Sequence, residues 1–137
     1  MKIVVTGAAG QLGRDLVPEL ESRGHEVLGV DLPELDITDR SGVLKLFADN
    51  RPDAVIHCAA WTAVDLAEDE ENIEKVRSIN VGGTENIANA CKKIDCKMIY
   101  ISTDYVFDGE GDTPWAADCK EYNPINVYGQ SKLDGEK

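Results

Sequence analysis

The feature that most constrains the fold is the start of the chain, where an apolar run is followed at once by a glycine-rich turn. Residues 3–5 form a β-branched run typical of a buried strand, and Gly7, Gly10 and Gly13 follow before a helix-like stretch. This order brings backbone N–H groups and the positive end of a helix dipole to a place where pyrophosphate can bind. Glycines allow the sharp turn, the approach of the backbone to the phosphates, and close helix packing. The pattern therefore predicts a dinucleotide site.

A second apolar run, residues 27–30, ends in Asp31. A carboxylate at the end of a second strand can accept hydrogen bonds from an adenosine ribose, so Asp31 strengthens the prediction. Its charge would repel a 2′-phosphate and the next residue, Leu32, offers no cation, so we expect NADH to be favoured over NADPH. A glycine-containing turn beside an unrelated surface aspartate is the alternative, and the joint presence of both features disfavours it.

The length and charge of the chain exclude several classes of protein. Residues 1–137 suffice for one domain with its own core, and 42% of them are hydrophobic. The formal net charge of −12 disfavours nucleic acid as a partner, because phosphate-binding surfaces require clustered Lys and Arg. The acidic run 68–71 is interpreted as a solvated helix face rather than a metal site, and no metal is expected.

Targeting and redox features favour the cytoplasm. The sequence has neither an apolar run long enough to cross a membrane nor a charged-then-apolar signal sequence, so we expect no membrane partner. The cysteines lack metal-ligand spacing and three lie in or beside apolar runs, which favours small buried thiols over disulfides. They are Cys58, Cys91, Cys96 and Cys119.

Apolar periodicity predicts strands that alternate with helices. We expect helices over 11–23, 40–50, 72–94 and 126–137, and strands over 3–5, 27–30, 54–60 and 97–102. This alternation predicts an α/β fold, a Rossmann-like doubly wound parallel sheet with right-handed crossovers. We expect the strand order 3-2-1-4, which would bring the carboxyl ends of the first and fourth strands together at the nucleotide site.

Three stretches depart from simple periodicity. Pro18 removes a backbone hydrogen bond from the first helix, so we expect a kink or a late start. Gly82 and Gly83 each cost about 1 kcal/mol within a helix, which indicates that another group approaches the backbone there. The stretch 103–126 has no sustained period and is predicted to be a long, functional loop.

Tyr128 and Lys132 are candidates for acid–base chemistry, because a separation of four residues places them on one helix face. A nearby cation stabilises phenolate and would lower the phenol pKa towards neutrality. Thr103 follows the fourth strand, where its hydroxyl could hold a carbonyl oxygen against the phenol. A Tyr-x-x-x-Lys pair also arises by chance, and the upstream glycine turn makes chance the lesser alternative. His57, in the third strand, is interpreted as a packed core residue rather than a catalyst.

These features resemble the extended short-chain dehydrogenase/reductases, and among them the dTDP-4-dehydrorhamnose reductase family. The resemblance covers nearly the whole chain, and its most specific part is the Ser-Thr-Asp-Tyr-Val-Phe-Asp-Gly block of residues 102–109. The other matching stretches are 6–13, Asp36-Ile37, 59–65, Asn80, Pro114-Trp115, 126–129 and Lys132. Family members continue with further strands and a substrate-binding C-terminal lobe, so the resemblance implies that 1–137 is an incomplete NAD(P)-binding Rossmann domain.

The resemblance also implies a role for each site residue. Tyr128 would donate a proton, Lys132 would tune it and hold the nicotinamide ribose, and Thr103 would orient the 4-keto oxygen. Asn80 would steady the helix above the active site, with a plain helix-interior polar residue as the alternative. Thr103 and Asp104 would contact the nucleotide-sugar. The remaining cofactor contacts would be Gly7, Gly10, Gln11, Leu12 and Gly13 in the glycine turn, Asp31 at the adenosine ribose, Asp36 and Ile37 at the adenine, and Ala59, Ala60, Trp61, Thr62 and Ile101 towards the nicotinamide.

The implied function is a reductase that transfers a hydride from NADH or NADPH to the C4 carbonyl of dTDP-4-dehydro-L-rhamnose, giving dTDP-L-rhamnose for bacterial surface polysaccharide. One alternative is a non-catalytic NAD(P)-binding regulatory subunit similar to that of methionine adenosyltransferase. Another is a nucleotide-sugar epimerase or dehydratase, which would retain NAD⁺ tightly. A dTDP-sugar is the expected partner, and a homodimer is compatible with the resemblance. We expect the 137-residue chain alone to bind dinucleotide weakly at best and to be inactive, because its fourth strand would be an exposed edge.

Overall fold

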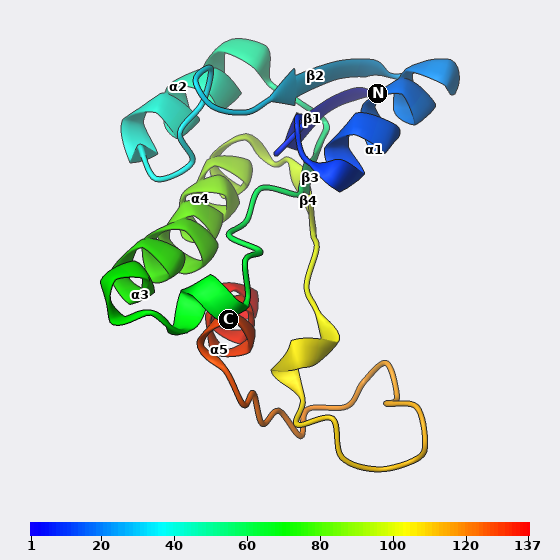
Figure 1. The fold of residues 1–137 in the computed structure, drawn as a ribbon. Coiled ribbons are helices and arrows are strands. Elements are labelled where there is room, and N and C mark those ends of the chain that lie inside the picture. The colour runs from blue at the N-terminus through cyan, green and yellow to red at the C-terminus, as the bar shows by residue number, and fades with distance from the viewer.

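The fold is a parallel β-sheet with helices on both faces (Figure 1). The computed structural model describes all of residues 1–137. Its strands are β1 (Lys2–Thr6), β2 (Glu26–Val30), β3 (Ala54–His57) and β4 (Lys97–Tyr100). Its helices are α1 (Gln11–Ser22), α2 (Arg40–Asn50), α3 (Glu70–Arg77), α4 (Thr84–Ile94) and α5 (Val127–Glu136), with 3₁₀ turns η1 (Asp65–Glu68) and η3 (Asp104–Val106) and a π-helical segment η2 (Ser78–Gly83). The predicted Rossmann-like α/β fold class is confirmed.

The predicted strand order is wrong, because the observed order is β2-β1-β3-β4 with every pair parallel. Val4 of β1 pairs with Leu28 of β2 and with Val55 of β3. The helix α1 covers one face, where Val17 approaches Gly29, whereas α2 and α4 share a core with Val4 on the other face. The crossover from β1 to β2 passes over the first face, and the crossover from β2 to β3 passes over the second. Because both are right-handed, they run in opposite directions along the sheet, so β3 pairs with β1 on the side away from β2. The switch point therefore lies between β1 and β3.

The main core lies between the sheet and the helices α2 and α4. Val4 and Val55 from the sheet, Phe47 from α2 and Ile87 from α4 are fully buried there. Cys91 joins this cluster as a small buried thiol, as predicted, while the other three cysteines are half-buried and all four thiols are free. None of the helices is both long enough and apolar enough to cross a lipid bilayer.

Two helices differ from the sequence prediction. The helix α1 begins at Gln11 and continues through Pro18, so the late start is wrong. The stretch predicted as one helix over 72–94 is divided among α3, η2 and α4, and both Gly82 and Gly83 lie in η2. A Cβ at Gly83 would lie 2.5 Å from Ile37 Cδ1, whereas nothing lies within 4 Å of one at Gly82. The predicted close approach is therefore confirmed at Gly83 alone.

The long loop after β4 is ordered by aromatic stacking. The Phe107 ring stacks on Trp115 with centroids 4.6 Å apart and on Tyr122 with centroids 5.6 Å apart. The Asn123 N–H donates to the Val106 carbonyl at 3.0 Å, which closes the base of the loop. Apart from η3, no helix or strand forms before α5, in agreement with the predicted loop. The loop thus returns the chain to the body of the fold, where α5 packs against η2 and α3.

Candidate active site

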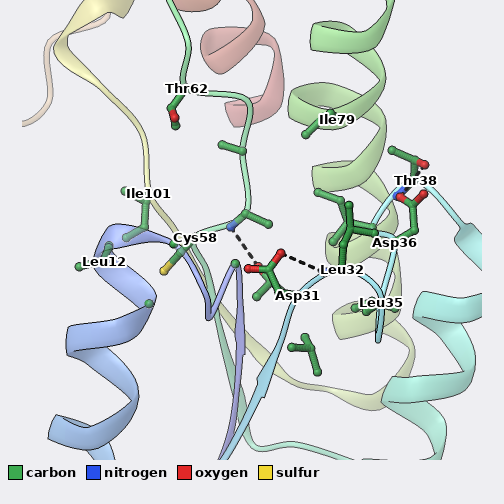
Figure 2. A pocket seen from close by; sticks show the side chains of 18 of the residues that line it. Leu12, Asp31, Leu32, Leu35, Asp36, Thr38, Cys58, Thr62, Ile79 and Ile101 are labelled. Atoms are coloured by element: carbon green, nitrogen blue, oxygen red, sulfur yellow. Dashed lines mark hydrogen bonds between the residues drawn. The ribbon is translucent and has the colours of Figure 1, made fainter.

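A cleft of about 860 Å³ opens at the carboxyl ends of β1, β2 and β3. Figure 2 shows Leu12 of α1 on one side, Ile79 of η2 on the other, and Asp31 between them at the end of β2. Most of the predicted cofactor residues line this cleft, namely Gly7, Gly10, Gln11, Leu12, Gly13, Asp31, Asp36, Ile37, Ala59, Ala60, Thr62 and Ile101. The other three, Trp61, Tyr128 and Lys132, lie outside its lining.

The turn after β1 brings backbone N–H groups to the cleft. Gly7 has a φ of +68°, and a Cβ there would lie 2.7 Å from the backbone nitrogen of Ala59. Glycine is the residue that meets both conditions without strain. The helix α1 begins directly after Gly10, and no side chain accepts hydrogen bonds from its first N–H groups. Such a helix N-terminus is suited to bind phosphate.

Two aspartates, Asp31 and Asp36, line the cleft with fixed carboxylates. Asp31 accepts from the Ala9 N–H at 3.0 Å and from the Leu32 N–H at 2.9 Å, so its carboxylate is fixed beside the glycine turn. Asp36 accepts from the hydroxyl of Thr38 at 2.7 Å and from the backbone N–H of the same residue at 2.8 Å. These two bonds, of which the bond from the hydroxyl has the larger effect, hold the pKa of Asp36 below its usual value. Both carboxylates therefore have fixed directions as acceptors for a ligand.

A buried chain of hydrogen bonds joins β1 to the helical layer through His57. Thr6 Oγ1 lies 2.7 Å from His57 Nδ1, and His57 Nε2 lies 3.2 Å from Thr84 Oγ1. The Thr84 hydroxyl donates its proton to the Asn80 carbonyl at 2.8 Å, so it accepts from His57 Nε2. The proton of the neutral imidazole is therefore on Nε2, and Nδ1 accepts from Thr6. His57 is a satisfied core residue, as predicted.

Asn80 connects the loop after β3 to α5. Its Oδ1 accepts from the Trp61 N–H at 2.7 Å, and its Nδ2 donates to the Trp61 carbonyl at 3.1 Å and to the Ser131 hydroxyl at 2.9 Å. The Ser131 hydroxyl in turn donates to the Tyr128 carbonyl at 2.7 Å. Asn80 thus steadies α5, the role that the sequence predicts for it.

Protonation of His57 should destabilise the fold. Burial, with a smaller effect of the Lys132 charge, lowers the pKa of His57 from 6.5 to about 4. The pKa of His57 is lower in the folded state than in the unfolded state, so lowering the pH favours the unfolded chain, which takes up the proton first. The stability that comes from the neutral imidazole is therefore complete above pH 6.5 and is lost as the pH falls towards 4. The loss should reach about 2 kcal/mol near pH 4.5. Urea unfolding at neutral pH and near pH 4.5 measures it.

The variant His57→Gln isolates this effect, because glutamine cannot gain the proton while the carboxylates titrate as before. Between the two pH values it should lose about 2 kcal/mol less stability than the unaltered chain. An equal loss in both proteins would show that His57 is not the titrating group.

Lys132 is enclosed behind the wall of the cleft. It is 3% exposed, its Nζ donates to the Ile101 carbonyl at 2.6 Å, and the same Nζ lies 4.1 Å from the centre of the Tyr100 ring. Burial lowers the pKa of Lys132 to about 8. Ile101 lines the cleft, so the Lys132 ammonium bonds directly to a residue of the cleft wall.

Tyr128 is half-buried, and its ring meets Tyr105 edge to face with centroids 5.9 Å apart. Burial raises the pKa of Tyr128, and a hydrogen bond with the Thr103 side chain opposes that rise. The spacing of four residues predicts that Lys132 lowers the pKa of Tyr128. This prediction is wrong, because the pKa of Tyr128 is raised. Burial outweighs the hydrogen bond, and the Lys132 ammonium bonds to a carbonyl rather than to the phenol. Thr103 and Tyr128 do come together as predicted.

Two other predicted residues do not line the cleft. The Trp61 ring lies 5.4 Å from the Lys75 ammonium. Asp104 begins η3, where its carboxylate accepts from the Thr103 hydroxyl at 3.2 Å.

The wall formed by α3 and η2 contains lining residues that sequence reasoning missed. Lys75, Ser78 and Ile79 belong to it, and Figure 2 shows Ile79. No motif marks these residues, because they reach the cleft only through the packing of the two segments beside the loop after β3.

Known proteins resemble the whole chain. The family model described as RmlD substrate binding domain matches residues 1–137. A dTDP-4-dehydrorhamnose reductase of Mycolicibacterium smegmatis is 44% identical over 137 residues, which are 99% of this chain and 40% of that protein. A crystal structure of a dTDP-4-dehydrorhamnose reductase from Clostridium acetobutylicum has a TM-score of 0.93 at 44% identity and covers 99% of this chain and 48% of its own.

A further structure, of the dTDP-4-dehydrorhamnose reductase from Bacillus anthracis in complex with NADP, has a TM-score of 0.93 at 41% identity, over 98% of this chain and 47% of its own. The chain thus spans less than half the length of these relatives. Since the family model covers every residue, the chain belongs to the RmlD substrate binding domain family.

Proposed function

We propose that this chain is the cofactor-binding and catalytic part of a reductase that moves a hydride from NADH or NADPH to the C4 carbonyl of dTDP-4-dehydro-L-rhamnose, giving dTDP-L-rhamnose. The observation that carries the proposal is the bond that links α5, the helix of the candidate catalytic residues, to the cleft wall. Lys132 bonds the carbonyl of the lining residue Ile101, and Tyr128 shares its helix and contacts Thr103. The names of the relatives support the substrate class.

The cleft has the shape and the donors that a nicotinamide dinucleotide requires. Glycine at position 7 lets the turn pack against Ala59, and the first N–H groups of α1, which no side chain caps, can donate to phosphates. The volume of about 860 Å³ lies in the range of sites that enclose a large ligand. When bound, the dinucleotide supplies the hydride, and the protein supplies position and proton. The complex of the Bacillus anthracis relative with NADP supports this class of cofactor.

In this proposal Tyr128 donates the proton that the C4 oxygen acquires during reduction. Because burial raises its pKa, the phenol carries its proton at neutral pH. Its O–H bond breaks as the proton moves to the C4 oxygen, and a phenolate remains. Thr103, whose side chain lies close enough to the phenol to oppose the rise of its pKa, orients the carbonyl. Lys132, four residues further along α5, has a pKa of about 8 and bonds the carbonyl of the lining residue Ile101.

Cofactor oxidation with the keto sugar tests the proposal. A full-length protein that contains this chain should oxidise NADH, seen as a loss of near-ultraviolet absorbance, only when dTDP-4-dehydro-L-rhamnose is added. NMR of the product should identify dTDP-L-rhamnose. Binding of NADH without turnover would favour a regulatory subunit, and purification with tightly retained NAD⁺ would favour an epimerase or dehydratase. Either of these results would contradict the proposal.

NADH should bind about fivefold more tightly than NADPH, because a 2′-phosphate would meet the Asp31 carboxylate. Leu32, the next residue, is 69% exposed and supplies no cation. Titration with each nucleotide measures the ratio. The variant Asp31→Asn keeps an acceptor for the Ala9 N–H but removes the charge, so it should bring the two affinities together. Equal affinities in the unaltered protein, or tighter binding of NADPH, would contradict the prediction.

A further inference from the structure

The cleft carries an excess of negative charge. Asp15, Asp31 and Asp36 line it, and Lys75 is the single Lys or Arg among its 22 lining residues. A dinucleotide would add the two negative charges of its pyrophosphate. The N-terminus of α1 supplies only about half a positive charge. A cation in the wall of the cleft therefore affects how tightly such a ligand binds.

Lys75 is held at the cleft without a competing partner. It lies in the last turn of α3 and is exposed, and its Nζ is 5.4 Å from the centre of the Trp61 ring, a distance at which a cation and an aromatic face attract each other. None of the five ion pairs of the chain includes Lys75. Its charge is thus positioned by Trp61 but not neutralised by a carboxylate.

Lys75 belongs to the wall opposite the glycine turn. Figure 2 shows Leu12, at the start of α1, on one side of the cleft and Ile79, about one helical turn after Lys75, on the other. A ligand that contacts the N-terminus of α1 lies between these walls. We propose that the Lys75 ammonium binds the pyrophosphate of the dinucleotide from this second wall, facing the uncapped N–H groups at the N-terminus of α1. The inference rests on the proposed dinucleotide site and adds to it a residue that no motif marks.

The variant Lys75→Gln tests the inference, because it removes the charge of an exposed side chain and keeps most of its length. A full-length protein that contains this chain is titrated with NADH, NADPH and adenosine, and the affinities are measured by calorimetry. Lys93→Gln is the matched control, since Lys93 is exposed and unpaired on α4, outside the cleft. Lys75→Gln should weaken NADH binding by about threefold to tenfold and reduce its salt dependence. Adenosine binding, and all binding to Lys93→Gln, should stay unchanged.

Unchanged NADH binding by Lys75→Gln would overturn the inference and leave the proposed function intact. Equal weakening of adenosine and NADH would also overturn it, since adenosine has no phosphate. A larger loss for NADPH than for NADH would assign Lys75 to the 2′-phosphate and so overturn its assignment to the pyrophosphate. If the unaltered full-length protein bound neither dinucleotide, the proposed function would be contradicted, and the inference with it.

Discussion

Replacing Tyr128 by phenylalanine in a full-length protein that contains this chain is expected to lower kcat by about 10²-fold or more, the usual contribution of a general acid. The substitution removes only the phenol oxygen, and the ring keeps its edge-to-face packing on Tyr105, with centroids 5.9 Å apart. Nucleotide binding should persist, because Tyr128 does not line the cleft. Steady-state turnover of the keto sugar, measured beside an NADH titration, separates catalysis from binding.

Tyr122→Phe is the matched control for this experiment. Tyr122 lies in the long loop, is 39% exposed, and stacks on Phe107 through its ring. Its loss of a hydroxyl should leave kcat near normal. Near-normal turnover by Tyr128→Phe would mean that another group delivers the proton, and an equal fall in both variants would point to a disturbed loop.

Gly7→Ala should have the largest effect on stability. The residue has a φ of +68°, and its new Cβ would lie 2.7 Å from the Ala59 nitrogen, a backbone atom that cannot rotate away. The left-handed conformation costs about 1 to 2 kcal/mol for alanine, and the collision adds about 1 to 3 kcal/mol. The sum is a large share of a typical stability of about 5 to 15 kcal/mol. Urea unfolding measures the loss, and an NADH titration should show weaker binding.

Gly24→Ala separates the two causes. Gly24 has a φ of +81°, but nothing lies within 4 Å of a Cβ built there. Its replacement should therefore cost only the conformational part, about 1 to 2 kcal/mol. An equal loss of stability in the two variants would show that the backbone at Gly7 and Ala59 shifts to make room for the methyl group, and would contradict the prediction.

Local sequence patterns predict the parts of the fold that depend on one element and its immediate neighbours. The apolar run 3–5 forms β1, Gly7 makes the turn, and Asp31 follows β2 at the cleft. All three follow from the order strand, turn, helix, strand, in which each residue's environment is set within a short stretch of chain. The same locality explains why Asn126 caps α5 near its predicted start, where its Oδ1 accepts from the Gly129 N–H at 2.6 Å.

Features that depend on distant segments could not be predicted in the same way. Periodicity shows which face of a strand is buried but not which strand lies beside it, so β3 is misplaced in the predicted order. Lys75 reaches the cleft only through the packing of α3. The pKa of Tyr128 depends on burial, which a spacing of four residues from Lys132 does not reveal.

The amide of Asn80 leaves its position with very few acceptable replacements. Its oxygen and both of its N–H groups are engaged by Trp61 and Ser131. Aspartate would turn an acceptor towards the Trp61 carbonyl, which is itself an acceptor, and leucine would leave the Trp61 N–H and carbonyl without the amide that pairs them. Gly82, in the same π-helical segment, has open space where a methyl group would go. Position 82 therefore has room for a side chain, whereas position 80, two residues earlier, requires an amide. The difference comes from the hydrogen bonds that each position makes and not from its location in the chain.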